Sequence, residues 1–421
     1  MIGCRCRSAF DCLAATAAVF VAGLWPGDPA AAQQPRSWAW CANEDNAFAP
    51  DVAISGCTAV IRSGTQTRKN LAVAFNRRCL ALNNKKEHQR AVADCDQAIR
   101  LGPAYQNAFV NRGAAHYGMK NHERALADYT EALRLDPKDA IALNDRGNVW
   151  HGKGDEDRAI ADYDGAIRLN PSYSYPYNGR ANAWRAKGEI DRAIADYDHA
   201  IRLDPAYATA IVNRGAAWRL KGDNDRAIAD YDVAIRLNPT DANAFNSRGN
   251  AHNDKQDYDR AIADYDMAIR LDPNAVSSYR SRGYANFYQV NYAAAASDLA
   301  RAVELQPDQA YAAIWLYLAR ARAGDPGAAA ELETNAARLK PADWPYPVAE
   351  LYLGRRTTAD TLAATGKAGD RCEAQFYVGE WHLLKGDRAA AGAALKLAAD
   401  TCPGTFIESL GARAELRRLG Q

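Results

Sequence analysis

The sequence predicts an all-α fold, a solenoid of stacked antiparallel helical hairpins. Alanine is abundant, and the alternation of apolar and polar residues that marks β-strands is scarce. Prolines recur at steps of 34 residues, at Pro103, Pro137, Pro171, Pro205, Pro239, Pro273 and Pro307. Small residues follow the same step, at Gly113, Gly147, Ala181, Gly215, Gly249 and Gly283. A fixed period of this length is the signature of a repeat architecture, in which neighbouring units bury a shared core.

Each repeat is expected to form two helices. The unit at 208–241 reads ATAIVNRGAAWRLKGDNDRAIADYDVAIRLNPTD. The first helix runs through N-R-G-A-A-W, Gly222 marks the turn, and Pro239 ends the second helix because proline cannot continue it. Small residues let the two helices approach closely, while Trp218 and Tyr231 supply bulk against the neighbouring unit. One hairpin cannot bury its apolar face alone, so the units must stack.

This spacing of small, aromatic, alanine and proline positions resembles the tetratricopeptide repeat (TPR) family. The resemblance implies a right-handed superhelix, approaching one superhelical turn, whose first helices line a concave groove that holds a protein or peptide partner. The expected segments are a degenerate hairpin at 33–71, seven repeats at 72–309, a diverged repeat at 310–343, a linker helix region at 344–371, and a last repeat with a capping helix at 372–421.

The C-terminal part carries a second resemblance, to the end of the bacterial lipoprotein family NlpI. The stretches that carry it are A-I-W-L-Y-L-A at 313–319, W-P-Y-P-V-A-E-L-Y-L-G at 344–354, and F-Y-V-G-E-W-H-L-L-K-G-D from Phe376. This resemblance implies an envelope adaptor that organises peptidoglycan hydrolases or a protease, and it implies a homodimer. Two departures are the missing lipid-bearing cysteine and the larger number of repeats.

The first residues are interpreted as a cleaved signal peptide at 1–32. Arg5 and Arg7 precede the apolar run Leu13–Leu24, and small residues that fit a cleavage site follow it. The run is short for a bilayer span, so we expect a mature start near Gln33, no stable membrane anchor, and a periplasmic or secreted protein. The alternative is an uncleaved membrane anchor.

The cysteines fit an exported protein. Nine are present, and three of them belong to the expected signal peptide. The remaining six are expected to form intra-hairpin disulfides because their positions face each other across antiparallel helices. The expected pairs are Cys41–Cys57, Cys79–Cys95 and Cys372–Cys402. The alternative is that these cysteines are buried free thiols at packing positions.

Composition and motifs exclude several functions. The net charge is +1, with positive and negative residues balanced, which argues against nucleic acid as the main partner. The sequence has no histidine spacing typical of zinc, no glycine-rich phosphate loop and no nucleophile elbow. We therefore expect no catalytic residues, no metal and no cofactor.

The charged residues of the second helix are interpreted as structural. Arg226 and Asp230 are four residues apart, as are Asp232 and Arg236, and most units repeat this pattern. The spacing predicts ion pairs along an exposed helix face. Carboxylates such as Asp162 recur identically in every unit, whereas catalysis needs one distinct site.

The candidate ligand-binding residues are polar side chains of the first helices. They are Asn144, Asn148, Asn178, Asn182, Arg185, Arg219, Asn246 and Asn250. Asparagine offers both a donor and an acceptor, which suits the backbone of an extended peptide, and arginine suits carboxylates. The alternative is that these asparagines satisfy the backbone of the next helix or face water.

The sequence therefore predicts an exported scaffold for protein–protein interaction. The first hypothesis is an adaptor of cell-envelope hydrolases or proteases. The second hypothesis is a binder of short extended peptides or unfolded segments. An enzyme is the third class, and no residue pattern in the sequence supports it.

Overall fold

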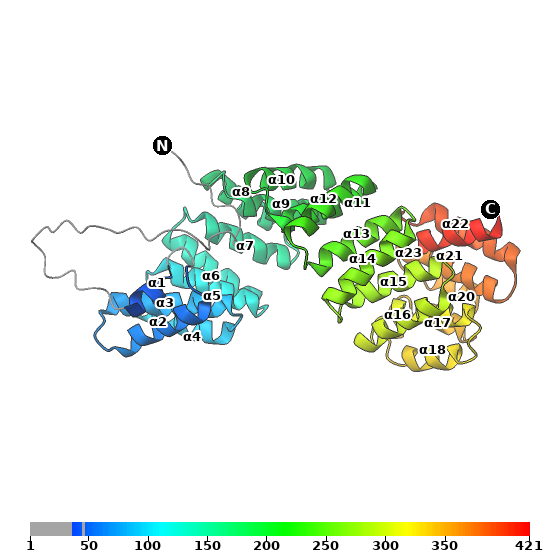
Figure 1. Ribbon diagram of the computed structural model, residues 1–421, viewed down its shortest axis with the longest axis horizontal. Helices are drawn as coiled ribbons and strands as arrows, with labels where there is room; N and C mark the ends of the chain where they lie inside the picture. Colours follow the sequence, from blue (N-terminus) through cyan, green and yellow to red (C-terminus); the bar gives the residue numbers. More distant parts are fainter. Residues whose placement is uncertain (1–35, 44–46) are drawn as a thin grey trace, which may run out of the picture. The chain divides into compact units, whose positions relative to one another are not determined.

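The protein is all-helical throughout the part that the structure describes. A computed structural model describes residues 36–43 and 47–421, with α1 to α23 and no strand in these ranges. The expected signal peptide at 1–32 lies outside the described residues. Contacts divide the chain into two compact parts, residues 1–115 and residues 116–421, and each is described by itself (Figure 1).

The first part consists of helical hairpins. Its helices are α1 (Arg36–Ala42), α2 (Pro50–Arg62), α3 (Arg68–Asn84), α4 (His88–Leu101) and most of α5 (Gln106–Gly118). Contacts join α1 to α2 and α3 to α4 as hairpins, and α2 packs against α3. The degenerate unit expected at the N-terminus therefore contains a hairpin of its own.

In the second part, six regular hairpins follow α6, and the chain ends in a less regular segment. The hairpins are α7 (Ala140–Gly152) with α8 (Glu156–Leu169), α9 (Ser174–Ala186) with α10 (Ile190–Leu203), α11 (Ala208–Leu220) with α12 (Asn224–Leu237), α13 (Ala242–Asp254) with α14 (Tyr258–Leu271), α15 (Val276–Tyr288) with α16 (Tyr292–Leu305), and α17 (Ala310–Arg322) with α18 (Ala328–Ala336). The other helices are α6 (His122–Leu135), α19 (Tyr346–Tyr352), α20 (Thr358–Ala363), α21 (Ala368–Leu384), α22 (Arg388–Thr401) and α23 (Ile407–Leu419).

Local signals explain where the helices of one unit start and turn. Gly222 has φ 81°, a left-handed conformation that glycine adopts without a steric penalty. The Asp223 side chain then caps α12 by accepting a hydrogen bond from the Arg226 backbone N–H. Between the two helices, a Cβ on Gly215 would lie 2.8 Å from Cε1 of Tyr231. The tyrosine ring therefore fills the space that the small residue leaves, which explains their joint recurrence.

Direct contacts between successive first helices form a continuous surface. The contacting pairs are α7 with α9, α9 with α11, α11 with α13, α13 with α15, and α15 with α17. We call the surface formed by these six helices the inner face. The residue positions expected to meet a ligand all lie on the helices of this face.

Arginines of the first helices join the hairpins through a row of ion pairs. In α11, Nε and Nη2 of Arg214 donate to the two carboxylate oxygens of Asp230, at 2.9 and 2.6 Å. Its Nη1 donates to Asp198 of the preceding unit at 2.6 Å. The same double pairing is made by Arg180, Arg248 and Arg282. One guanidinium thus closes its own hairpin and also holds the unit before it.

The expected ion pairs along the second helix are wrong. Asp230 is buried and is held by Arg214 of the first helix, whereas Arg226 stays largely exposed. Asp232 pairs with Arg248 of the following unit, at 2.6 Å. The reason is geometric, because these aspartates face the first helices, where a planar guanidinium reaches both oxygens of a carboxylate. An exposed ion pair along one helix contributes only about 0.3–0.5 kcal/mol, which is less than the bidentate pair with the first helix provides.

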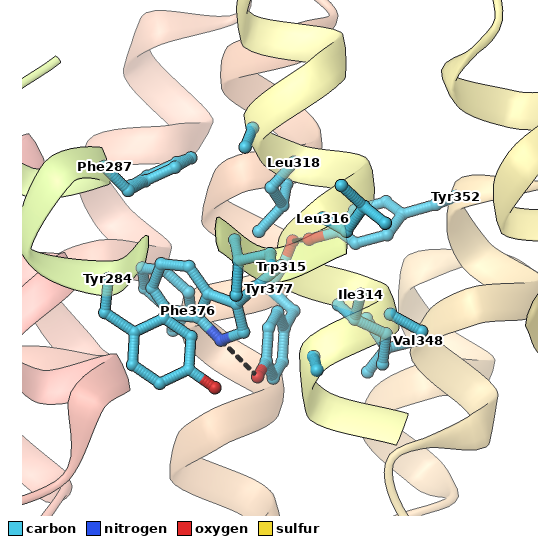
Figure 2. Close-up of a cluster of buried hydrophobic side chains, with 14 of the residues drawn as sticks. Tyr284, Phe287, Ile314, Trp315, Leu316, Leu318, Val348, Tyr352, Phe376 and Tyr377 are labelled. Atoms are coloured by element: carbon cyan, nitrogen blue, oxygen red, sulfur yellow. Dashed lines mark hydrogen bonds between the residues drawn. The ribbon is translucent and has the colours of Figure 1, made fainter. Parts of the chain in front are cut away.

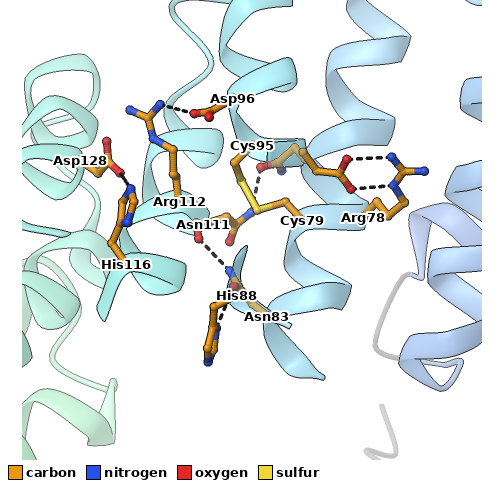
Figure 3. Close-up of a disulfide and its surroundings, with 12 residues drawn as sticks. Arg78, Cys79, Asn83, His88, Cys95, Asp96, Asn111, Arg112, His116 and Asp128 are labelled. Atoms are coloured by element: carbon orange, nitrogen blue, oxygen red, sulfur yellow. Dashed lines mark hydrogen bonds and ion pairs between the residues drawn. A yellow bond between two sulfur atoms is a disulfide. The ribbon is translucent and has the colours of Figure 1, made fainter. Parts of the chain in front are cut away.

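Three disulfides lie in the described residues, in the pairing that the spacing predicts. Sulfur–sulfur distances are 2.05 Å for Cys41–Cys57, 2.14 Å for Cys79–Cys95 and 2.20 Å for Cys372–Cys402. Each bond closes one helical hairpin near an end of the described chain, α1 with α2, α3 with α4, and α21 with α22, where Cys402 directly follows α22. Figure 3 shows Cys79–Cys95 beside the pair in which Arg78 donates twice to Asp94, at 2.6 and 2.7 Å.

The C-terminal segment builds the largest apolar core among the described residues. Trp315 of α17 is fully buried and stacks on Phe376 of α21, with ring centroids 5.2 Å apart (Figure 2). Its indole N–H donates to the Tyr377 hydroxyl at 3.1 Å. Helix α23 also packs on α15, where the Tyr288 hydroxyl donates to the Ile407 carbonyl at 2.7 Å. The C-terminal helix is thereby held against the fifth of these six hairpins, α15 with α16.

Candidate functional site

Three asparagines of the inner face share one arrangement. Asn148, Asn182 and Asn250 each accept a hydrogen bond, through Oδ1, from the buried second-helix tyrosine of the same hairpin. The distances are 2.8 Å from Tyr163, 2.6 Å from Tyr197 and 2.9 Å from Tyr265. All three asparagines are half-buried, and among the described residues their Nδ2 groups have no hydrogen-bond acceptor. One end of each amide is thus structural, and the other remains a donor.

The other three asparagines make different hydrogen bonds. Asn144 is buried, and its Nδ2 donates to Asp145 at 3.1 Å, while its Oδ1 has no partner. Asn178 is also buried and accepts from Asn213 at 3.1 Å. Asn246 accepts from the Ser278 hydroxyl at 3.2 Å. The Asn178 and Asn246 side chains thus link neighbouring first helices, whereas Asn144 bonds only within its own helix.

A half-buried carboxyl on α7 and a row of aromatic rings lie toward the N-terminal end of the inner face. Burial raises the pKa of Asp145 to about 6, although the Asn144 hydrogen bond acts in the opposite direction. The rings of Tyr173, Tyr175 and Tyr207 follow one another, with centroids 5.5 and 5.0 Å apart. Tyr175 is 53% exposed, so this row offers flat contact area to a ligand.

The two predicted arginines have different surroundings. Arg219 donates to Asp254 of the next first helix at 2.6 Å, and burial raises the pKa of this aspartate. Arg185 is half-buried and lies near the Tyr197 hydroxyl. Burial raises the pKa of Tyr197 to about 12, and Arg185 acts in the opposite direction. Arg219 is therefore largely neutralised within the chain, whereas Arg185 has no carboxylate partner among the described residues.

A hollow of about 400 Å³ lies where the inner face meets the C-terminal segment. Its lining comes from α11, α13, α15, α17 and α21 and from residues 406–408. The lining residues are Arg219, Asn250, Arg280, Ser281, Tyr284, Tyr311, Glu373, Phe406, Ile407 and Glu408. We call it the terminal hollow. It brings together two predicted site residues, Arg219 and Asn250, and the remaining predicted residues do not line it.

Several polar residues of this region were missed by sequence reasoning. Asn213 lies one position off the asparagine rows, so the 34-residue step does not reveal it. Glu373 and Glu408 lie outside the regular repeats, and no periodic signal marks them. Asp254 is the final residue of α13, where the sequence alone suggests exposure, yet Arg219 of the preceding first helix covers it.

Within residues 36–43 and 47–421, no group of histidine, cysteine, aspartate and glutamate side chains is arranged to hold a metal ion. No helix in the same ranges combines the length and the apolar character that a membrane crossing requires.

Family models match the middle of the chain. Models described as tetratricopeptide repeat match residues 249–314, and residues 110–174 and 221–276. A model described as TPR repeat matches residues 181–219. These matches end at residue 314, at the start of the segment with the second resemblance.

Two solved structures are similar to parts of this chain. The APC/C hetero-tetramer Cut9–Hcn1 is 17% identical over 64% of this chain and 52% of the other, with a TM-score of 0.53. The similarity thus spans about half the length of that chain. A tetratricopeptide repeat protein from Parabacteroides merdae is 20% identical over 59% of this chain and 94% of the other, with a TM-score of 0.48. At such identities, the likeness concerns the fold alone.

Proposed function

This chain is a solenoid of tetratricopeptide repeats, and on that premise we propose that it is an exported scaffold that binds a protein or peptide partner through its inner face. Such repeats support protein–protein interaction, and stacked units create extended binding surfaces. We further propose that the chain has no catalytic activity of its own. Its repeated carboxylates are held by arginines in successive units, which leaves them a structural role.

The observation that carries this proposal is a row of three asparagines in which only one end of the side-chain amide is hydrogen-bonded. Asn148, Asn182 and Asn250 are each fixed by a tyrosine hydroxyl on Oδ1, while the described residues supply no acceptor for Nδ2. A donor held in one orientation loses little conformational freedom on binding, which favours affinity. Peptide carbonyl groups of an extended ligand are suitable acceptors for such a row.

Export is supported by the cysteine chemistry. Disulfides form and persist in oxidising compartments, and all six cysteines of the described chain are paired. Together with the N-terminal signal pattern, this favours a periplasmic or secreted protein. The resemblance of the C-terminal segment favours an adaptor of envelope hydrolases or proteases as the more specific role, with a homodimer as its assembly.

A capture experiment tests this function. The mature chain from Gln33 is used as bait in a solubilised envelope fraction, and we expect it to retain peptidoglycan hydrolases or a protease. The matched bait replaces Asn148 and Asn182 by alanine and Tyr163 and Tyr197 by phenylalanine, so that no buried hydroxyl loses its acceptor. The control bait carries only the two tyrosine changes and keeps both amides.

The outcomes separate the hypotheses. Loss of partners with the fourfold variant, but not with the tyrosine control, supports the inner face as the binding site. Equal capture by all baits contradicts this site and directs attention to the C-terminal segment. The peptide-binding alternative is favoured if synthetic linear peptides displace the captured partner. An adaptor that recognises a folded partner would keep that partner bound in the presence of linear peptides.

A further inference from the structure

The terminal hollow contains hydrogen-bond donors that the chain itself does not use. Tyr284 is only 4% exposed, yet its hydroxyl has no hydrogen-bond partner. Figure 2 shows this hydroxyl at the edge of the aromatic cluster, with no bond to any residue drawn. A buried polar group without a partner is uncommon and costs about 1–3 kcal/mol. Such a group at the wall of a hollow indicates that an acceptor is supplied from outside.

Arg280, on the same helix, is a cation without a carboxylate partner among the described residues. Its Nη1 donates to the neutral Gln309 side chain at 3.2 Å. By contrast, Arg282, two residues further along α15, holds two aspartates, and Arg219 across the hollow holds Asp254. The chain neutralises the other arginines of this region and leaves Arg280 free to meet an anion.

The two acidic residues of the hollow do not neutralise Arg280. Glu373 accepts from the Tyr311 hydroxyl and the Trp344 indole N–H, both at 2.8 Å. Glu408 accepts from the Tyr377 hydroxyl at 2.7 Å. Burial raises the pKa of both glutamates, that of Glu408 to about 8, so Glu408 is largely uncharged at neutral pH. The hollow therefore repels an anion less than its composition suggests.

The wall of the hollow is fixed and partly apolar. Residues 406–408 are held on α15 by the hydrogen bond from Tyr288 to the Ile407 carbonyl. The rings of Phe406 and Tyr311 border the space beside the donors. A volume of about 400 Å³ lies within the roughly 300–1,000 Å³ of typical ligand pockets.

We propose that the terminal hollow receives a carboxylate of the bound peptide, held by Arg280 and the Tyr284 hydroxyl. This inference rests on the proposed peptide- or protein-binding function and names the chemistry of one end of that site. The carboxylate has two sources, a chain terminus or an acidic side chain. In either case the neighbouring rings accommodate apolar ligand atoms next to the charge.

Affinity capture of defined peptide pools on the mature chain tests the proposal. The first pool contains hexapeptides without acidic residues and with a free C-terminal carboxylate, and the second contains the same peptides as C-terminal amides. The third pool contains amidated peptides with one internal glutamate. We expect at least about tenfold greater retention of the first or the third pool than of the second. Preference for the first identifies a terminus, and preference for the third identifies a side chain.

The variants are chosen so that folding and binding are separated. Arg280→Gln and Tyr284→Phe are each expected to lower retention of the preferred pool about tenfold, to nearly that of the second pool, which has no carboxylate. Tyr284→Phe removes a hydroxyl without a partner, so its Tm is expected to stay the same or rise, whereas a structural hydroxyl would lower it. Arg236→Gln, at an exposed arginine of α12, serves as the matched charge control and is expected to change nothing.

Equal retention of all three pools, or unchanged binding by both variants, overturns the carboxylate site while peptide binding by the inner face still stands. Retention of no pool by the wild-type chain overturns the carboxylate site and the peptide-binding hypothesis together. Capture of folded partners from the envelope fraction then decides the scaffold function separately.

Discussion

At the scale of single residues, the turn between the two helices of each unit demands one left-handed backbone position. Gly154, Gly188 and Gly222 supply it with φ between 77° and 82°. The homologous position is Gln256 in the next hairpin and Val290 in the one after, with φ 63° and 68°. A β-branched side chain is rarely tolerated in this region, so Val290 is a local weakness of its hairpin.

Val290→Gly is therefore expected to raise the free energy of unfolding by about 1 kcal/mol, because it relieves a left-handed β-branched residue. Val290 is half exposed, so little apolar packing is lost. Thermal unfolding followed by circular dichroism measures the change. Gly222→Val, the reverse substitution at an equivalent turn, is expected to destabilise, and a lower Tm for Val290→Gly would contradict the argument.

A second residue-scale prediction concerns Glu408. It is 2% exposed, and burial raises its pKa from 4.5 to about 8. Between pH 4.5 and 8, the folded state therefore holds a proton that the unfolded state has already lost. The stabilisation that this proton brings is complete below pH 4.5 and is lost as pH rises through about 8, with a slope of at most about 1.4 kcal/mol per pH unit.

Glu408→Gln removes this titration but keeps an oxygen that accepts from Tyr377. We expect urea unfolding to give a stability difference between wild type and variant that changes steadily between pH 5 and 8. Other raised carboxyls, Asp145 and Glu380 among them, remain in both proteins and cancel in the comparison. Parallel pH profiles would show that Glu408 is not protonated in the folded chain.

At the scale of elements, the arginine row decides how one hairpin holds the next. Arg214 lies in a first helix and holds an aspartate of its own hairpin and another of the preceding unit. Buried Asp230 and more exposed Asp198 therefore share one guanidinium. This geometry couples a pair within the unit to a pair between units, and it explains why arginine and both aspartates recur together.

Arg214→Met is expected to cost about 3 kcal/mol, because it leaves the Asp230 carboxylate buried without its partner. The double variant Arg214→Met with Asp230→Asn is expected to recover part of this loss. Chemical denaturation with a double-mutant cycle measures both values. Arg226→Met breaks the exposed contact with Asp223 and is expected to change stability by less than about 1 kcal/mol, so equal costs at both arginines would contradict the burial argument.

At the scale of the whole molecule, disulfides close the hairpins nearest to the two ends of the described chain. An end unit of a solenoid lacks one stacking neighbour and so buries less apolar surface than an inner unit. Covalent closure compensates because it restricts the unfolded chain. The cysteines are thus placed where stacking contributes least.

Replacing Cys79 and Cys95 by alanine is expected to destabilise the N-terminal hairpins by about 3 kcal/mol, as estimated for a loop of about 15 residues. Hydrogen exchange should locate the loss in α3 and α4 rather than in α11 or α12. Thiol titration of the denatured, unreduced mature chain is expected to detect no free thiol. Detection of thiols, or a destabilisation spread evenly over the repeats, would contradict this assignment.

Features that depend on neighbours in the chain could be predicted from the sequence alone. Helix type, turn positions and hairpin boundaries follow from periodic glycine, alanine, tyrosine and proline, and the rows through Asn148 and Asn182 follow from the same period. The pairing of cysteines could also be predicted, because antiparallel helices bring residues of one hairpin together at a fixed separation.

The contacts between side chains of different units, and those at the chain end, depend on the folded structure and could not be predicted from the sequence. Arg214 selects Asp230 and Asp198 over nearer charges, because burial strengthens a bidentate pair more than sequence proximity does. The terminal hollow forms because α23 returns to α15, through contacts such as Tyr288 with Ile407, 119 residues apart. Such a contact depends on the summed geometry of several hairpins, and no local pattern encodes that sum.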